Sequence, residues 1–191
     1  MIQPHMPNSL LLPTGPAPVP TARHLPLFGD AASTSNTGDG RARFELPPGR
    51  PLAVLCVELE GVRVVTWASG PATGEELLRL VHERMAGVLA SADTVDHLAG
   101  GSFACLRTGA HNRESLCRLA WRLLDATAAP ISVGRFRFTL HPHIGIALRP
   151  ADGMGYAHLF RNARAAMHRA RHQRSGCAFF DPAADVWEHD D

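Results

Sequence analysis

The sequence has no long apolar run and no excess of charge of either sign. None of its hydrophobic stretches approaches the roughly 20 residues that a transmembrane helix requires. The formal net charge is +1, so no strong field favours nucleic acid or a membrane surface as a partner. The opening segment MIQPHMPNSLLLPTGPAPVP lacks both a basic region and a long apolar core, which makes it a poor secretory signal. We therefore predict a cytoplasmic location and binding to neither nucleic acid nor membrane.

Cysteine is scarce, and its four residues are far apart. Cys56, Cys105, Cys117 and Cys177 each lie within an apolar stretch. Free cysteine is one of the most buried residue types, and intracellular proteins seldom carry disulfides. We therefore favour four buried, reduced thiols over two disulfides.

The composition changes along the chain. Residues 1–47 are rich in Pro, Gly, Ser and Thr, and such a segment buries too little apolar surface to offset its ordering entropy. We predict a mostly disordered tail over 1–47, a single domain over 48–184 with order beginning near Pro51, and an acidic C-terminal tail over 185–191.

Apolar periodicity predicts alternating strands and helices, with no internal repeat. Thr73 and Glu76 have the spacing of a capping box at the start of the first helix. The expected strands are 52–60 (central and buried), 94–99 and 102–108 (a hairpin around Gly100 and Gly101), 131–148 (a hairpin around Gly134) and 177–181, and the expected helices are 75–89, 114–127 and 158–173. This order predicts an α/β or α+β fold, with a central mixed sheet and helices on both faces.

Several local motifs, in this order, resemble the GGDEF domain, the catalytic unit of diguanylate cyclases. The segment FRNARAAMHRARHQ and the later FFDP are similar to the closing helix and strand of the family. HIGIA is similar to its SIGIA strand, and TGEELL to its GDELL helix start. The resemblance covers residues 52–182 and implies the nucleotidyl-cyclase-like fold.

The resemblance also implies a degenerate signature. Aligned on Phe103, the segment AGGSF places Ala99 and Gly100 at the two glycine positions of the family. Gly101 then stands where a metal-binding acid belongs, and Ser102 where the catalytic glutamate belongs. Joining two GTP molecules requires divalent ions, and Mg²⁺ takes oxygen ligands that glycine cannot supply. We therefore predict no cyclase activity.

The remaining nucleotide positions are partly retained. Glu58 replaces the first acid of the family's DxD strand, and Glu60 follows on the same face. Glu58, with Glu60 beside it, could bind a metal ion weakly. We favour instead a solvated strand end, or an ion pair of these acids with Arg63. Thr66 and Glu75 fall at the guanine-reading positions, and Thr66 lacks the paired donor and acceptor of an amide. Glu75 could accept a hydrogen bond from guanine. We favour a structural role, in which its negative charge interacts favourably with the helix dipole in the first turn.

Two further anion sites of the family are altered. The inhibitory RxxD motif is ASAD here, so Ala90 replaces the arginine while Asp93 remains, and binding of cyclic di-GMP is not expected. Arg171 matches a lysine that contacts the triphosphate in the family. It shares one helical face with Arg161, Arg164 and His168, which is either a phosphate-binding stripe or, as we favour, a solvated face.

Histidine and tryptophan supply the last candidates. His141 and His143 share one face of a strand and could ligate a metal, but no cysteine or acid is near in sequence, so we favour packed histidines. Trp121 is predicted to be a packing residue. Trp67 replaces an aspartate of the family loop, and an exposed tryptophan there is a candidate for partner binding.

The sequence thus favours a catalytically inactive signalling domain without a cofactor, which acts by binding another protein of cyclic di-GMP signalling. The expected partner is a cyclase, a phosphodiesterase or a second copy of the chain. The expected contact surface consists of Trp67, the hairpin tip Gly100–Ser102 with Gly101 at its centre, and the two arginines Arg161 and Arg164. A GTP-sensing domain that uses Glu58, Thr66, Glu75 and Arg171, with Mg²⁺ only if GTP binds, is the alternative. Residual cyclase activity ranks last.

Overall fold

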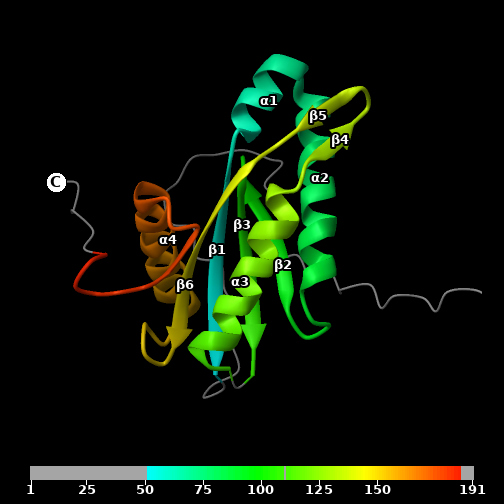
Figure 1. Ribbon diagram of the computed structural model, residues 1–191. Coiled ribbons are helices and arrows are strands. Elements are labelled where there is room, and N and C mark those ends of the chain that lie inside the picture. Colours follow the sequence, from blue (N-terminus) through cyan, green and yellow to red (C-terminus); the bar gives the residue numbers. More distant parts are fainter. Residues whose placement is uncertain (1–50, 110, 186–191) are drawn as a thin grey trace, which may run out of the picture.

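One buried strand, β1 (Leu52–Glu60), lies at the centre of the sheet, as its apolar run predicts. The computed structural model describes residues 51–109 and 111–185, so the tail predicted over 1–47 and most of that over 185–191 lie outside the described residues. The strand order is β2-β3-β1-β6-β7 (Figure 1). β3 (Ser102–Thr108) and β6 (His141–Arg149) pair with β1 antiparallel. β2 (Thr94–Ala99) pairs with β3 antiparallel, and β7 (Cys177–Phe179) pairs with β6 parallel. The predicted mixed sheet is confirmed.

Helices cover both faces of this sheet, which confirms the predicted fold class. α2 (Pro71–Val88) and α3 (Arg113–Ala128) lie on one face, and α4 (Tyr156–Gln173) lies on the other (Figure 1). Side chains along β1 alternate between two hydrophobic cores: Leu55 and Val57 face α2 and α3, whereas Val54 and Cys56 face α4. None of the helices in the described ranges is long and apolar enough to cross a bilayer.

Gly145 lets α4 pack directly against β6. A Cβ atom at this position would lie 1.9 Å from the carbonyl oxygen of Ala163 and 2.2 Å from the amide nitrogen of Met167. Both are backbone atoms of α4, so they cannot move aside without moving the helix. The close approach of strand and helix therefore requires glycine here.

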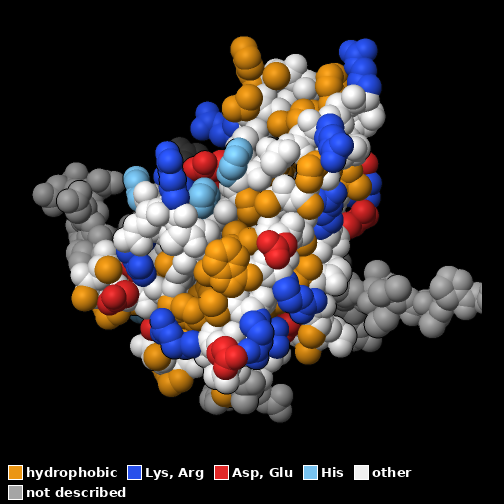
Figure 2. Space-filling view, in the orientation of Figure 1, with side chains coloured by type: hydrophobic (Ala, Val, Ile, Leu, Met, Phe, Trp, Pro, Cys, Tyr) orange, Lys and Arg blue, Asp and Glu red, His pale blue; other side chains and the backbone are white. Residues whose placement is uncertain are grey.

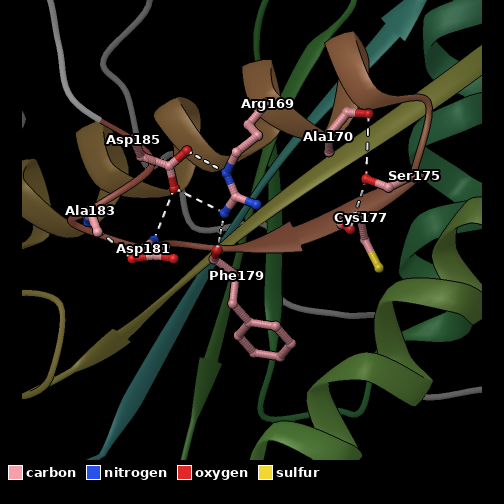
Figure 3. Close-up of polar contacts among 8 residues, drawn as sticks. All are labelled: Arg169, Ala170, Ser175, Cys177, Phe179, Asp181, Ala183 and Asp185. Atoms are coloured by element: carbon pink, nitrogen blue, oxygen red, sulfur yellow. Dashed lines mark hydrogen bonds and ion pairs between the residues drawn. The ribbon is translucent and has the colours of Figure 1, made fainter.

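A buried ion pair fixes the chain after β7 to α4 (Figure 3). Asp185, with a side chain only 1% exposed, accepts from Arg169 Nε at 2.7 Å and from the backbone amide of Asp181 at 2.9 Å. Arg169 Nη2 also donates to the carbonyl oxygen of Phe179 at 2.6 Å. These bonds connect the closing strand and the turn that follows it to the helix beneath them.

The predicted start of the first long helix is wrong. α2 begins at Pro71 after Gly70, and no side chain caps it. The Thr73 hydroxyl donates to the carbonyl oxygen of Ser69, four residues earlier, and Glu76 pairs with Arg79. Proline is favoured at the first position of a helix, which explains the earlier start. Glu75 therefore lies beyond the first turn, and its assignment to the helix dipole is wrong as well.

Two other local predictions need correction. The expected hairpin over 131–148 is divided: β4 (Ile131–Val133) and β5 (Phe136–Phe138) form a separate two-stranded sheet, while β6 joins the main one. The helix α1 (Val62–Ser69) was not predicted, because its β-branched residues have low helix propensity. Burial of Val62 in the core outweighs that preference.

All four cysteines are free thiols, but only two are buried. Cys56 and Cys105 lie in the core, and burial raises the pKa of Cys56 to about 12. Cys117 and Cys177 are half-buried, so the prediction of burial is wrong for these two. Burial also raises the pKa of Cys177, to about 11. Thiols with such pKa values are poor nucleophiles near neutral pH.

We predict that Gly145→Ala destabilises the domain by about 1–3 kcal/mol, because the added methyl group collides with the backbone of α4. Gly87→Ala is the matched control. Gly87 lies exposed in α2, and an added Cβ meets nothing within 4 Å. Alanine there should raise stability by about 0.5–1 kcal/mol. Urea unfolding followed by circular dichroism measures both, and an unchanged midpoint for Gly145→Ala contradicts the packing constraint.

Candidate functional site

The glycine pair forms the tip of the β2–β3 hairpin, as predicted, but its two members have different roles. Gly100 takes a left-handed conformation with φ of +56°, whereas Gly101 does not. Gly101 instead approaches β1: its carbonyl oxygen accepts from the Leu59 amide at 2.9 Å. A Cβ at Gly101 would lie 2.5 Å from the carbonyl oxygen of Leu59. This position therefore lacks an acid and also lacks room for one.

The residues aligned with the family's metal site do lie together. Ser102 is directly opposite Glu58 on β1, and Glu58 is directly opposite His143 on β6. Directly opposite residues of antiparallel strands point to the same face, which here is the face covered by α4. The fold thus brings together Ser102 and Glu58, which the alignment assigned to the family's metal and catalytic positions.

Arg171 of α4 occupies the centre of this cluster. Its Nη1 lies 3.5 Å from Glu58 Oε1, and its Nε lies 3.8 Å from Glu60 Oε1. His143 Nε2 lies 3.7 Å from the other oxygen of Glu60. A pair with Arg63, one of the two arrangements favoured from the sequence, is therefore wrong, because the guanidinium group beside both acids comes from α4.

The residues present do not fit a catalytic Mg²⁺ site. Two carboxylates remain, and the group placed between them is already a cation. Gly101 and Ser102 add no carboxylate from the hairpin. Over residues 51–109 and 111–185, no group of three or more His, Cys, Asp or Glu side chains could hold a metal ion. His143 is mostly buried beside Glu60, whereas its neighbour on the strand face, His141, is exposed.

The predicted basic stripe on α4 is weaker than its residue types suggest. Burial lowers the pKa of His168, and the positive charge of Arg171 lowers it further, which favours neutral imidazole at pH 7. Arg171 itself is engaged with the two acids. Arg161 and Arg164 are exposed on α4, on the opposite face of the sheet from α1 and α2.

An open groove with a volume of about 1030 Å³ lies between α1 and α2. We call it the α1–α2 groove, and its lining residues are Val62, Arg63, Val64, Thr66, Trp67, Pro71, Gly74, Glu75, Leu78 and Gly100. Hydrophobic side chains project from the end of the molecule that α1 forms (Figure 2). Trp67 is 88% exposed, which confirms the exposure that its candidacy for partner binding requires.

The α1–α2 groove contains the two predicted guanine-reading positions, but only one of them is available. The Thr66 hydroxyl donates to the carbonyl oxygen of Val62 at 2.9 Å and lies against Gly74. Its hydrogen is therefore used within the fold. Glu75 is exposed, and its carboxylate is the remaining group able to accept from a base.

The expected contact surface is divided by the fold. Trp67 and the hairpin tip at Gly100 line the same groove, as predicted. Arg161 and Arg164 lie on α4, on the other face of the sheet. Sequence reasoning missed the groove because it missed α1; the signal was Gly61 and Gly70 on either side of residues 62–69, with Pro71 at the start of the next helix.

At the position of the family's inhibitory RxxD motif, the remaining acid forms hydrogen bonds within the fold. Asp93, with a side chain only 3% exposed, accepts from the Ala90 amide at 3.2 Å and from Arg107 Nη1 at 3.4 Å. The acid of the family motif therefore closes a local turn here. Its oxygens face the protein, and Ala90 supplies no donor for a phosphate.

Comparisons with known proteins identify the family and the fold. The family described as "Diguanylate cyclase, GGDEF domain" matches residues 42–177. The chain is 35% identical over 138 residues to the bifunctional diguanylate cyclase/cyclic di-GMP phosphodiesterase MucR of Pseudomonas aeruginosa, covering 72% of this chain and 20% of that protein. It spans about a fifth of the length of the curated relatives that head the comparison.

Solved structures show the same fold. An EAL/GGDEF domain protein from M. capsulatus superposes with a TM-score of 0.65 at 32% identity, covering 70% of this chain and 87% of that one. The GGDEF domain of TpbB from Pseudomonas aeruginosa also gives a TM-score of 0.65, at 27% identity, and covers 69% of this chain and 83% of that one.

We predict that cyclic di-GMP does not bind at micromolar concentration, because Ala90 removes the bidentate phosphate donor and Asp93 is engaged in the fold. Isothermal titration calorimetry at physiological salt measures this. A GGDEF domain that retains RxxD is the positive control. Saturable micromolar binding by this chain contradicts the prediction.

We also predict that Arg171→Ala creates a weak divalent-cation site that the native chain lacks. Glu58 and Glu60 then lie side by side on one face of β1 without the guanidinium group, so Mn²⁺ should raise the thermal midpoint of this variant by a few degrees. Mn²⁺ should leave the native chain and Arg161→Ala unchanged, since Arg161 is exposed on the same helix. Equal Mn²⁺ effects on all three proteins would show that Arg171 does not occupy the cation position.

Proposed function

Because the chain belongs to the GGDEF family, we propose that it is a catalytically inactive signalling domain of the cyclic di-GMP system that acts by binding protein. One observation carries the proposal: the guanidinium group of Arg171 pairs with both acids that remain at the end of β1, Glu58 and Glu60. The hairpin that should contribute further carboxylates presents Gly101 and Ser102 instead.

The chemistry supports an inactive site. Attack of a 3′-hydroxyl on the α-phosphate of GTP requires cations that stabilise charge on the phosphate and on the attacking oxygen. A guanidinium group held by two carboxylates leaves little net charge for that task. Ser102 is neutral and is a poor general base at pH 7. No group at the hairpin tip replaces the missing carboxylates.

The α1–α2 groove supports binding of protein over binding of nucleotide. Its walls are mainly apolar, and an exposed tryptophan borders it. Tryptophan and arginine are the residue types that most often anchor protein interfaces. The partner in this proposal is a cyclase, a phosphodiesterase or a second copy of the chain, in keeping with relatives named for both activities. A cytoplasmic location stays a prediction.

A GTP-sensing domain is the second candidate, and the volume of the same groove favours it. Two of its four proposed ligands are engaged in the fold, however: Thr66 with Val62, and Arg171 with the acids. Calorimetric titration with GTP and Mg²⁺ separates the candidates. Saturable binding favours the sensor, and no binding favours the protein-binding domain.

We predict that the purified chain forms no cyclic di-GMP from GTP with Mg²⁺ or Mn²⁺, measured by mass spectrometry against an active cyclase. The double variant Gly101→Asp with Ser102→Glu should stay inactive, since the aspartate Cβ collides with Leu59 and the Thr66 hydroxyl is engaged elsewhere. Product formation by the native chain that Glu58→Ala abolishes would show that the site is active and would overturn the proposal.

A further inference from the structure

Two cysteines that are 60 residues apart in the sequence, Cys117 of α3 and Cys177 of β7, meet where this helix packs against this strand. Both side chains are half-buried, and their thiol groups share a hydrogen bond. Figure 3 shows the Cys177 side chain directed from β7 towards the green helix α3, in agreement with its packing against the core on that face. The fold therefore brings two free thiols into contact.

Contacts on either side of the two cysteines fix this arrangement. One helical turn before the cysteine of α3, the guanidinium carbon of Arg113 lies 4.0 Å from the centre of the Phe179 ring. One turn after it lies the half-exposed Trp121, and a Cβ atom added at Gly176 would be 3.6 Å from the Trp121 ring. Residues four apart on a helix share one face, as do residues two apart on a strand. The cysteine pair is thus held between two contacts that join the same helix to the same strand.

The other two cysteines are arranged differently. Cys56 belongs to the core beneath α4, whereas Cys105 belongs to the core beneath α2 and α3, so the sheet separates their side chains. Cys56 is 2% exposed and Cys105 is 0% exposed, which excludes a dissolved oxidant from both. These two thiols provide an internal comparison for the pair on α3 and β7.

We infer that Cys117 and Cys177 form a site of reversible oxidation, at which a disulfide bond links α3 to β7. Disulfide formation requires two sulfur atoms that meet without movement of the backbone, and the contacts on either side supply this condition. In a reducing compartment such a pair is reduced at rest and is oxidised transiently. The inference goes beyond the proposed function, because the site lies outside both the α1–α2 groove and the ion pairs of Arg171.

The oxidant in this inference is a low-molecular-weight disulfide. One cysteine thiolate attacks it, which breaks its S–S bond, forms a mixed disulfide with the protein and releases one small thiolate. The second cysteine thiolate then attacks the protein sulfur of the mixed disulfide and expels the second small thiolate. The two cysteines together lose two protons and two electrons, and the small disulfide takes them up as two thiols.

Peptide mapping of the full chain tests the site. The reduced, folded chain is incubated with oxidised glutathione, then denatured, alkylated, digested and analysed by mass spectrometry without reduction. Burial raises the pKa of Cys177 to about 11, so exchange is slow at neutral pH and the incubation is run at about pH 8.5. We expect a cross-linked pair of peptides containing Cys117 and Cys177, with Cys56 and Cys105 alkylated as free thiols.

Single variants separate formation of the link from simple modification by glutathione. Cys117→Ser and Cys177→Ser should each retain one glutathione per chain as a mixed disulfide, because the second thiol that would expel it is missing. Oxidation of the native chain should raise the thermal midpoint by about 5–10 °C, since the bond closes a long loop of the unfolded chain. Dithiothreitol should return the midpoint to its original value, and the oxidant should leave the midpoint of Cys117→Ser unchanged.

Four outcomes would overturn the inference: an incubated chain without the link, a link that involves Cys56 or Cys105, a link between two chains, or a link that lowers the thermal midpoint. The last outcome would show that the native fold does not hold the two sulfur atoms at bonding distance. The cyclase assay and the titration with GTP are run on the reduced chain. Failure of the disulfide therefore leaves the proposed function standing, and cyclase activity of the reduced chain leaves the disulfide standing.

Discussion

The contact between α4 and β6 at Gly145 is the constraint on which the site depends. Because no side chain separates the two backbones at this point, α4 lies close against β6 there. That position brings Arg171, near the end of the helix, within 3.5–3.8 Å of Glu58 and Glu60. The packing that completes the core on this face thus also places a permanent cation between the two remaining acids.

This arrangement changes what the end of β1 can do. The chain contains no lysine, so all 19 of its Lys and Arg residues are arginine. A guanidinium group stays protonated at any physiological pH, so the charge on Arg171 is not removed by titration. The negative charge of the two acids of β1 is therefore partly balanced from within the fold. The nearby α1–α2 groove stays open, and its lining is mainly apolar.

Most of the fold could be predicted because it follows local periodicity. The apolar run of β1, the glycine pair of the β2–β3 hairpin and the amphipathic pattern of α4 each lie within one segment. The errors arose where packing outweighs local preference. α1 is a helix despite its β-branched residues, and α2 begins before the Thr73–Glu76 pair because Pro71 starts it.

The sequence by itself determined that the hairpin lacks its catalytic acids, because glycine and serine carry no carboxylate in any conformation. Tertiary structure alone decided where the remaining charges go. Arg171 and Glu58 are 113 residues apart in the chain, and only the packing of α4 on the sheet brings them together. The exposure of Trp67 likewise depends on α1, whose helix is stabilised by core contacts. Residue identity fixes which groups exist, whereas long-range packing fixes which of them meet.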